Sequence, residues 1–112
     1  MAIVNKRNGE IIAYDFKLCK NVLQQARGLM FSGKKTLVFI FKKEKHTPLH
    51  MFFVFFPIDV FFLDNSKKVV EIKKNLKPFA MYNPQKKAKY IIEIPHGLVE
   101  NTAVEMGDSL EF

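Results

Sequence analysis

The segment that decides the fold of this chain reads LHMFFVFFPIDVFFL and comprises residues 49–63. Its apolar run up to Ile58 has about half the length of a helix that could cross a bilayer, which needs roughly 20 apolar residues. Pro57 and Asp59 interrupt the run. We therefore predict two β-strands, Leu49–Phe56 and Ile58–Leu63, which form the central hairpin of a water-soluble fold.

The first of these strands would be apolar on both faces, because successive side chains of a strand point to opposite sides. Both faces then need cover. One can line the interior of the domain. The other can lie under a helix of the same chain, against a partner subunit, or in an exposed apolar patch. We favour cover by the chain's own helix, and we expect Phe53 and Phe55 to be almost fully buried.

The flanking sequence carries turn and cap signals. Asn8-Gly9 lies between two apolar pairs and predicts a hairpin that joins Ile3-Val4 to Ile11-Ile12. Asp15 is a plausible N-cap for a helix from Phe16 to Arg27, and Gly28 is a suitable stop. Pro95 suits the first position of a second short helix, which would end near Glu100. Further strands are predicted over residues 36–41, 68–73, 89–94 and 109–112.

Many short strands and little helix favour a small barrel or sandwich over a parallel sheet with crossover helices. We predict an all-β or β-dominated α+β fold, namely a small, mainly antiparallel, β-barrel-like domain with two short helices. A length of 112 residues fits a single domain, residues 1–112.

Three sequence blocks carry a family resemblance. They are RGLMF (residues 27–31), Met51 with FPIDVFFLD (56–64), and YIIEIP (90–95) with Gly97 and Gly107-Asp108. In this order and spacing they resemble the family known as domain of unknown function 192, in an archaeal-type variant. The resemblance implies a compact, mainly antiparallel β fold. It implies no known activity, substrate or cofactor.

The net charge of +7 is unevenly distributed. The chain carries a charge of +12 up to Lys89 and −5 from Tyr90 onward. Sixteen of the eighteen basic residues are Lys, often in pairs, which is typical of soluble sheet proteins that protect their edges. Base-specific contacts depend more on Arg. Sequence-independent nucleic-acid binding through the Lys pairs therefore ranks last, because the Phe residues needed for base stacking are expected in the core.

Cellular location is suggested by cysteine content and by the first residues. Cys19 is the single cysteine, so the chain has no internal disulfide, and we expect a small buried thiol. Residues 1–5 lack the pattern of a signal peptide. We expect a cytoplasmic protein that does not insert into a membrane.

Asp59 is the most informative single residue, because an ionised carboxylate inside an apolar run needs a partner. Arg27 is the natural counter-ion, and we predict a buried Arg27–Asp59 ion pair that ties the helix end to the central hairpin. The alternative is that Asp59 lies in a cleft and takes part in ligand binding or acid–base chemistry.

Metal and cofactor sites are not expected. His46 and His50 would lie about 13 Å apart on a continuous strand, which is too far for both to bind one metal ion. The chain has no glycine-rich phosphate loop and no nucleophile elbow.

The leading functional hypothesis is a non-catalytic binding or accessory module, with a groove near Arg27, His50 and Asp59. Its partner would be a small ligand or another protein, and the chain would be a monomer or a weak homodimer. The alternative is an enzyme that uses Asp59 with His50 as an acid–base pair.

Overall fold

A computed structural model describes residues 2–97 and 104–112 of the chain. The elements are β1 (Ile3–Asn5), β2 (Ile11–Ala13), β3 (Lys17–Cys19), α1 (Val22–Arg27), β4 (Leu37–Lys45), β5 (Leu49–His50), β6 (Ile58–Leu63), β7 (Val69–Leu76), β8 (Met81–Tyr82), β9 (Ala88–Pro95) and β10 (Leu110–Glu111). No helix among the described residues has the length and apolar character needed to cross a membrane.

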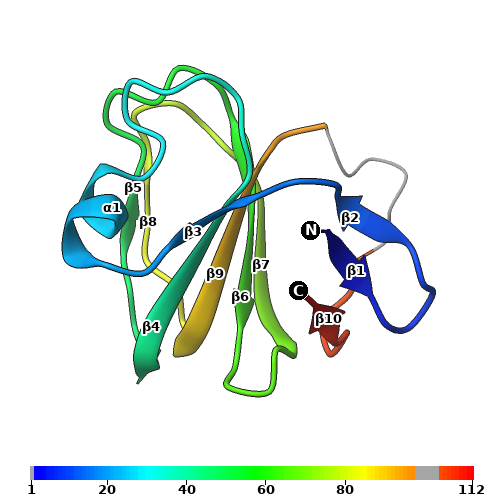
Figure 1. The fold of residues 1–112 in the computed structure, drawn as a ribbon. Coiled ribbons are helices and arrows are strands. Elements are labelled where there is room, and N and C mark those ends of the chain that lie inside the picture. The colour runs from blue at the N-terminus through cyan, green and yellow to red at the C-terminus, as the bar shows by residue number, and fades with distance from the viewer. Residues whose placement is uncertain (1, 98–103) are drawn as a thin grey trace.

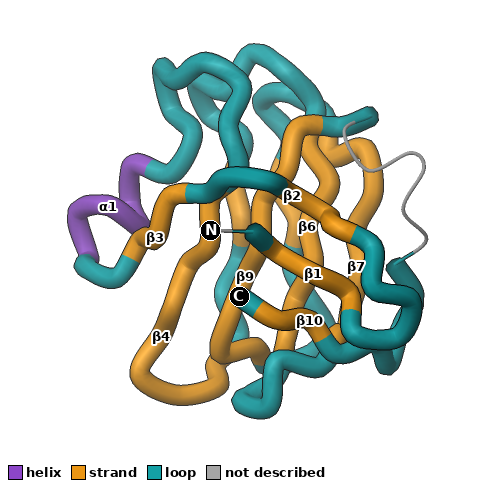
Figure 2. The backbone as a smooth tube through the Cα atoms, turned by 45° about the vertical axis from the view of Figure 1, so that its right-hand side comes forward, coloured by secondary structure: helices purple, strands orange, loops and turns teal. Residues whose placement is uncertain are grey.

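A five-stranded sheet forms the centre of the molecule, with the strand order β3-β4-β9-β6-β7 (Figure 1). Its neighbouring strands are antiparallel except β3 and β4, which are parallel. One face is covered by the small sheet β10-β1-β2 (Figure 2), and the other by α1 and the β5–β8 pair. The chain is therefore layered, with β9 at the centre.

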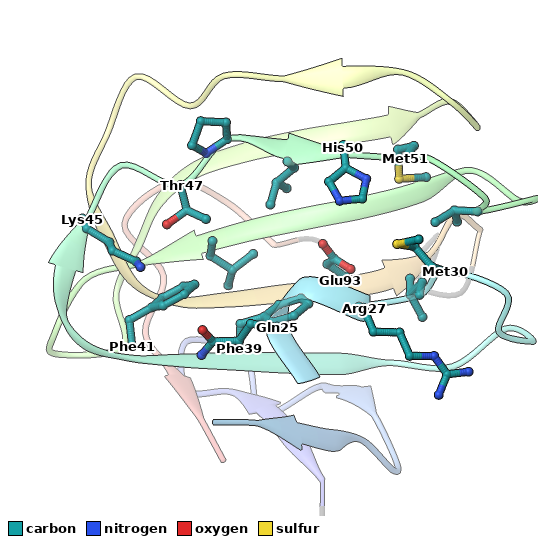
Figure 3. Close-up of a pocket in the computed structure, with 16 residues that line it drawn as sticks. Gln25, Arg27, Met30, Phe39, Phe41, Lys45, Thr47, His50, Met51 and Glu93 are labelled. Carbon is teal, nitrogen blue, oxygen red and sulfur yellow. The ribbon is translucent and has the colours of Figure 1, made fainter. Parts of the chain in front are cut away.

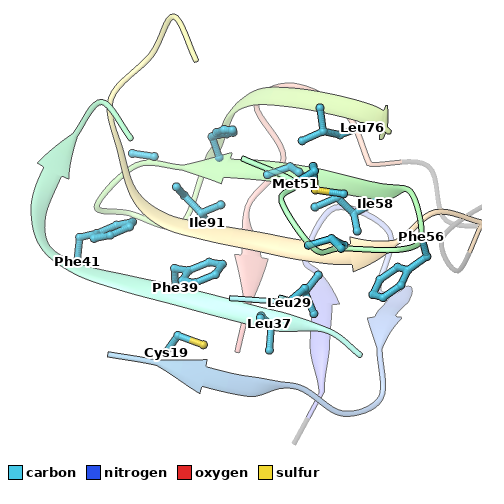
Figure 4. Close-up of a cluster of buried hydrophobic side chains, with 14 residues drawn as sticks. Cys19, Leu29, Leu37, Phe39, Phe41, Met51, Phe56, Ile58, Leu76 and Ile91 are labelled. Carbon is cyan, nitrogen blue, oxygen red and sulfur yellow. The ribbon is translucent and has the colours of Figure 1, made fainter. Parts of the chain in front are cut away.

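The two faces of the central sheet hold two separate apolar cores, as the alternation of side chains requires. On β6, Ile58, Val60 and Phe62 face α1, and Phe61 and Leu63 face the β10-β1-β2 sheet. On β9, Ile91 faces α1, and Ile92 and Ile94 face the opposite side. Figure 4 shows the core on the α1 side, where Phe39, Phe41, Met51 and Ile58 lie together.

Several sequence predictions are confirmed. The N-terminal hairpin pairs Ile3 with Ala13 and Val4 with Ile11, and Gly9 takes a positive φ of 73° in its turn. The strand Ile58–Leu63 has the predicted bounds and is buried throughout. The predicted strands over 36–41, 68–73, 89–94 and 109–112 correspond to β4, β7, β9 and β10.

The predicted helix from Phe16 to Arg27 is wrong in its first half. Lys17–Cys19 is strand β3, which pairs with the edge of β4. The helix begins only after Asn21, whose side chain accepts a hydrogen bond from the backbone N–H of Gln24. Its end at Gly28 is as predicted, and that glycine has a positive φ of 50°.

The predicted second helix and the barrel also need correction. Pro95 is the last residue of β9 and does not begin a helix; residues 98–100 of that prediction lie outside the described residues. The central sheet does not close into a barrel in the described part of the chain, residues 2–97 and 104–112. Strands β3 and β7 remain the edges of the five-stranded sheet.

The Phe-rich segment departs most from its predicted form. Only Leu49–His50 is a strand, and residues 51–57 form a loop. Met51, Val54 and Phe56 point into the core on the α1 side. The prediction that Phe53 and Phe55 are buried is wrong, since their exposed fractions are 44% and 63%.

Candidate functional site: a cleft between the helix and the central sheet

A cleft of about 360 Å³ lies between α1, the α1-facing side of β4 and β9, and the β5 segment (Figure 3). Its walls are mainly apolar and include Leu29, Met30, Phe39, Phe41, Leu49, Met51, Val54 and Ile91. The polar lining residues are Gln25, Arg27, Lys45, Thr47, His50 and Glu93. A concave, mostly apolar cleft with a few polar groups is the usual form of a small-molecule site.

Glu93 is the unusual residue of this cleft. It lies in the middle of β9 opposite Leu37 of β4 and Val60 of β6, so the sheet holds its backbone on both sides. Its side chain is 8% exposed and makes no hydrogen bond or ion pair with any described residue. Burial raises the pKa of this carboxyl to about 8. At pH 7 the group is therefore mostly protonated and neutral.

A second polar group of the cleft is also without a partner. The Thr47 hydroxyl is buried, and the described residues offer it no hydrogen bond. Unpaired buried polar groups are rare in native proteins and cost about 1–3 kcal/mol each. The Thr47 hydroxyl and the Glu93 carboxyl, which borders the same cleft, leave hydrogen-bonding capacity that a bound molecule could use.

Basic side chains lie around these groups. Lys45 of β4 places its ammonium 4.6 Å from the centre of the Phe41 ring. His50 ends β5 and is exposed, and Arg27 at the end of α1 is exposed as well. Figure 3 shows that Arg27 extends away from Glu93, whereas His50 lies across the cleft from the Phe39 side. The rim is therefore basic, and the buried carboxyl lies beneath it.

Asp59 does not belong to this cleft. It lies opposite Ile94 in the β6–β9 ladder and so shares the sheet face of Phe61 and Ile94, away from α1. Its carboxylate is 2% exposed and accepts hydrogen bonds from His96 Nδ1 at 2.8 Å and the backbone N–H of Asn75 at 2.9 Å. The predicted Arg27–Asp59 ion pair is therefore wrong.

Arg27 and His50 line one cleft, and the carboxyl that lines it with them is Glu93. The predicted pairing of His50 with Asp59 is wrong, since the two residues lie on opposite sides of the central sheet. Glu93 carries the same sequence signal as Asp59, namely one acidic residue within an apolar strand, YIIEIP. That signal could have identified it.

Comparison with known proteins establishes the family. Residues 3–112 match the model of the DUF192 family, described as Uncharacterized ACR. The chain belongs to this family. The resemblance drawn from the three sequence blocks is thus confirmed, and the DUF192 family has no assigned function.

Archaeal relatives match this DUF192 chain along nearly all its length. A UPF0127 protein of Thermococcus sibiricus is 36% identical, with 98% of this chain and 73% of the relative covered. A UPF0127 protein of Pyrococcus furiosus is 35% identical, with 98% of this chain and 97% of the relative covered.

Two solved bacterial structures share the fold. A protein of Sinorhizobium meliloti 1021, named as a proposed transcription regulator, aligns with a TM-score of 0.86 and 22% identity over 98% of this chain and 89% of its own. A protein of unknown function from Novosphingobium aromaticivorans aligns with a TM-score of 0.83 and 20% identity over 99% and 82%. At these identities the likeness concerns the fold alone.

Proposed function

We propose that this DUF192 protein is a small-molecule binding module whose site is the cleft between α1 and the central sheet. The observation that carries the proposal is the buried carboxyl of Glu93, which borders the cleft without a partner. Such a group is costly to the folded protein unless something else uses it. A ligand that donates a hydrogen bond or a positive charge to Glu93 would remove that cost.

The lining indicates the class of ligand. Apolar side chains such as Phe39, Met51 and Ile91 suit an apolar body. A protonated nitrogen would pair with Glu93 and would stabilise its ionised form, because a nearby opposite charge favours ionisation. The basic rim of Arg27, Lys45 and His50 would accept an acidic group at the other end of the same molecule. We therefore propose a small, largely apolar amine, with or without a distal acidic group.

A matched probe series tests this site. Benzylamine and benzyl alcohol have the same apolar ring and differ in the charge of the terminal group. Titration calorimetry should show that benzylamine binds and that benzyl alcohol binds at least about tenfold more weakly, which corresponds to about 1.4 kcal/mol. Below pH 8 the affinity for the amine should rise with pH, because free Glu93 must lose its proton before it pairs with an ammonium group.

Two variants provide the control. Glu93→Gln keeps the shape of the side chain and removes the charge, so it should abolish the preference for benzylamine. Glu10→Gln changes an exposed carboxylate in the N-terminal turn and should leave both affinities unchanged. Equal binding of amine and alcohol to the unmodified protein, or an amine preference that survives Glu93→Gln, would rule out the proposed role of Glu93.

A further inference from the structure

A cluster of exposed phenylalanine rings lies outside the cleft. Its members are Phe31, Phe53, Phe55 and Phe79, which we call the aromatic patch, and their exposed fractions lie between 44% and 65%. Phe31 stacks on Phe53 with a centroid distance of 4.7 Å, and Phe79 contacts both Phe53 and Phe55 edge-on. Four connected aromatic rings at the surface are unusual in a soluble domain, where large exposed apolar patches commonly mark interaction sites.

The backbone under the patch is strained. Phe31, Phe53 and Phe79 have φ values of 56°, 58° and 63°. They are three of the five non-glycine residues with positive φ in the described part of the chain. Bulky residues rarely adopt this conformation. Strain of this kind clusters at functional sites, where the surrounding structure holds a side chain in a required position.

Hydrogen bonds between loops hold the patch in place. The N–H of Phe31 donates to the carbonyl of Phe53 at 2.9 Å, which joins the loop after α1 to the loop after β5. The N–H of Phe79 donates to the carbonyl of Met51 at 2.8 Å, which adds the loop between β7 and β8. Figures 1 and 2 show these three loops together at one end of the molecule. These hydrogen bonds therefore fix the positions of the rings relative to one another.

The charges of these three loops all have one sign. The loop of residues 28–36 contains Lys34 and Lys35, and the loop of residues 77–80 contains Lys77. None of the three loops contains Asp or Glu. The complementary partner is therefore anionic and offers flat apolar surfaces to the rings.

We infer that the aromatic patch binds single-stranded nucleic acid without sequence preference, with bases stacked on the Phe rings and phosphates near the loop lysines. Successive bases stacked on aromatic side chains beside basic residues are the usual form of such sites. Nucleic acid ranked last in the sequence analysis because the Phe residues were expected in the core. The exposed position of these four Phe rings removes that objection. The inference concerns a surface other than the cleft and is independent of its proposed ligand.

The geometry favours nucleic acid over an anionic membrane. Phe31 and Phe53 are nearly parallel, at an interplanar angle of 19°, and Phe31 is 65% exposed, so a base can continue the stack. Insertion into a lipid surface depends on the apolar area that is buried and requires no fixed ring orientation. Base stacking depends on fixed ring orientations. It therefore explains the strained backbone better than insertion into a membrane does.

The test is fluorescence anisotropy of the whole chain with three labelled probes. These are a 12-nucleotide oligouridylate, a 12-nucleotide oligothymidylate, and an abasic strand of the same length that keeps the phosphates. We expect both base-bearing strands to bind more tightly than the abasic strand by roughly 5- to 100-fold, the range expected when one stacked base is lost. The affinity should fall with salt at a log–log slope near −2, if three lysines each neutralise one phosphate.

Matched variants separate stacking from general charge attraction. Phe31→Asn removes a ring while keeping a residue that tolerates positive φ, and Phe55→Ala removes a ring at a position without positive φ. Each should reduce oligouridylate affinity by roughly 5- to 100-fold and leave abasic binding unchanged. Met106→Ala is the control, because Met106 is an apolar residue with 59% exposure that lies outside the patch.

Three results would overturn the inference. They are equal affinity for the abasic and base-bearing strands, oligonucleotide affinity that neither patch variant reduces, and binding to phosphatidylglycerol vesicles without oligonucleotide binding. The last result would assign the patch to a membrane surface.

Discussion

His96 and Asp59 are joined by a hydrogen bond of 2.8 Å between imidazole Nδ1 and a carboxylate oxygen. Asp59 is buried, and the His96 side chain is 38% exposed. Since an ionised carboxylate can only accept, Nδ1 carries the proton in this bond. The backbone N–H of His96 also donates to the carbonyl of Pro57 at 3.0 Å. The two hydrogen bonds of His96 thus join the end of β9 to the start of β6.

The His96–Asp59 pair should contribute measurably to stability. His96→Ala leaves a buried carboxylate with the N–H of Asn75 as its remaining partner, and we expect a loss of about 1–3 kcal/mol in the free energy of unfolding. Arg27→Ala removes an exposed side chain that does not contact Asp59 and should cost about 0.5 kcal/mol or less. Urea denaturation at pH 7 measures both. An equal loss in both variants would contradict this assignment of partners.

Glu93 should make stability depend on pH. Its pKa is raised from 4.5 to about 8 by burial, so between these pH values the folded state holds one more proton than the unfolded state. The free energy of unfolding should therefore fall as pH rises through this range. Glu93→Gln should gain about 3–5 kcal/mol relative to the unmodified protein between pH 4.5 and 8. Denaturation curves at half-unit steps of pH test this, and identical pH profiles would show that Glu93 is not desolvated.

The loop after β5 should respond differently at two adjacent phenylalanines. Phe56 is 7% exposed and belongs to the core on the α1 side, so Phe56→Ala should cost about 3–5 kcal/mol. Phe55 is 63% exposed, and Phe55→Ala should cost less than about 1 kcal/mol. Thermal unfolding of both variants makes the comparison. If Phe55→Ala lowers stability more than Phe56→Ala does, residues 49–56 form the continuous strand that the sequence suggested.

Asp108 should support the acid stability of the N-terminal hairpin. It accepts hydrogen bonds from Arg7 Nε at 2.7 Å, Asn5 Nδ2 at 2.9 Å and the N–H of Glu105 at 2.8 Å. The bond from Arg7 is the main reason that the pKa of this carboxyl falls from 3.8 to about 2. The stabilisation is complete above pH 3.8 and is lost as pH falls through 2.

Removal of this carboxylate is the corresponding test. Asp108→Ala should lower the free energy of unfolding at pH 7 by about 2–4 kcal/mol, because several charge-assisted hydrogen bonds are lost together. Acid titration followed by circular dichroism should show a stability loss between pH 4 and 2 that is weaker in the variant. An unchanged acid transition would mean that other carboxylates dominate it.

The sequence predicted the elements whose signals are local. Asn8-Gly9 identified the first turn, because a glycine at positive φ is needed there. The turn after β6 carries a similar local signal in Asp64, whose carboxylate accepts from the N–H groups of Ser66 and Lys68. The strand Ile58–Leu63 was identifiable because it is apolar on both faces and ends at a turn.

Elements that depend on distant partners were not predictable in the same way. Residues 17–19 could begin a helix or extend, and their pairing with β4 decides between the two. Asp15 and Asn21 are both good N-caps, so the local signal does not choose between them. In residues 51–57 the sequence does not distinguish apolar side chains that enter the core from those that are exposed. No residue type in this segment indicates the positive φ of Phe53.

The candidate site was predicted in part for the same reason. Arg27 and His50 were placed near each other, but the strand face of a carboxylate depends on register, which local patterns do not reveal. Asp59 and Val60 lie one position apart on β6, and only Val60 shares the face of Glu93.

The central place of β9 affects how the chain can fold. Residues 88–95 follow β4 to β8 in the chain, yet β9 provides the hydrogen-bonding partner for both β4 and β6. A nascent chain can form the β6–β7 hairpin early, but β4 keeps one unpaired edge until residues 88–95 have left the ribosome. Because such long-range pairing closes large loops before it gains contacts, folding should be slow for a chain of this size. Until then the exposed edges of β4 and β6 leave the incomplete chain prone to aggregation.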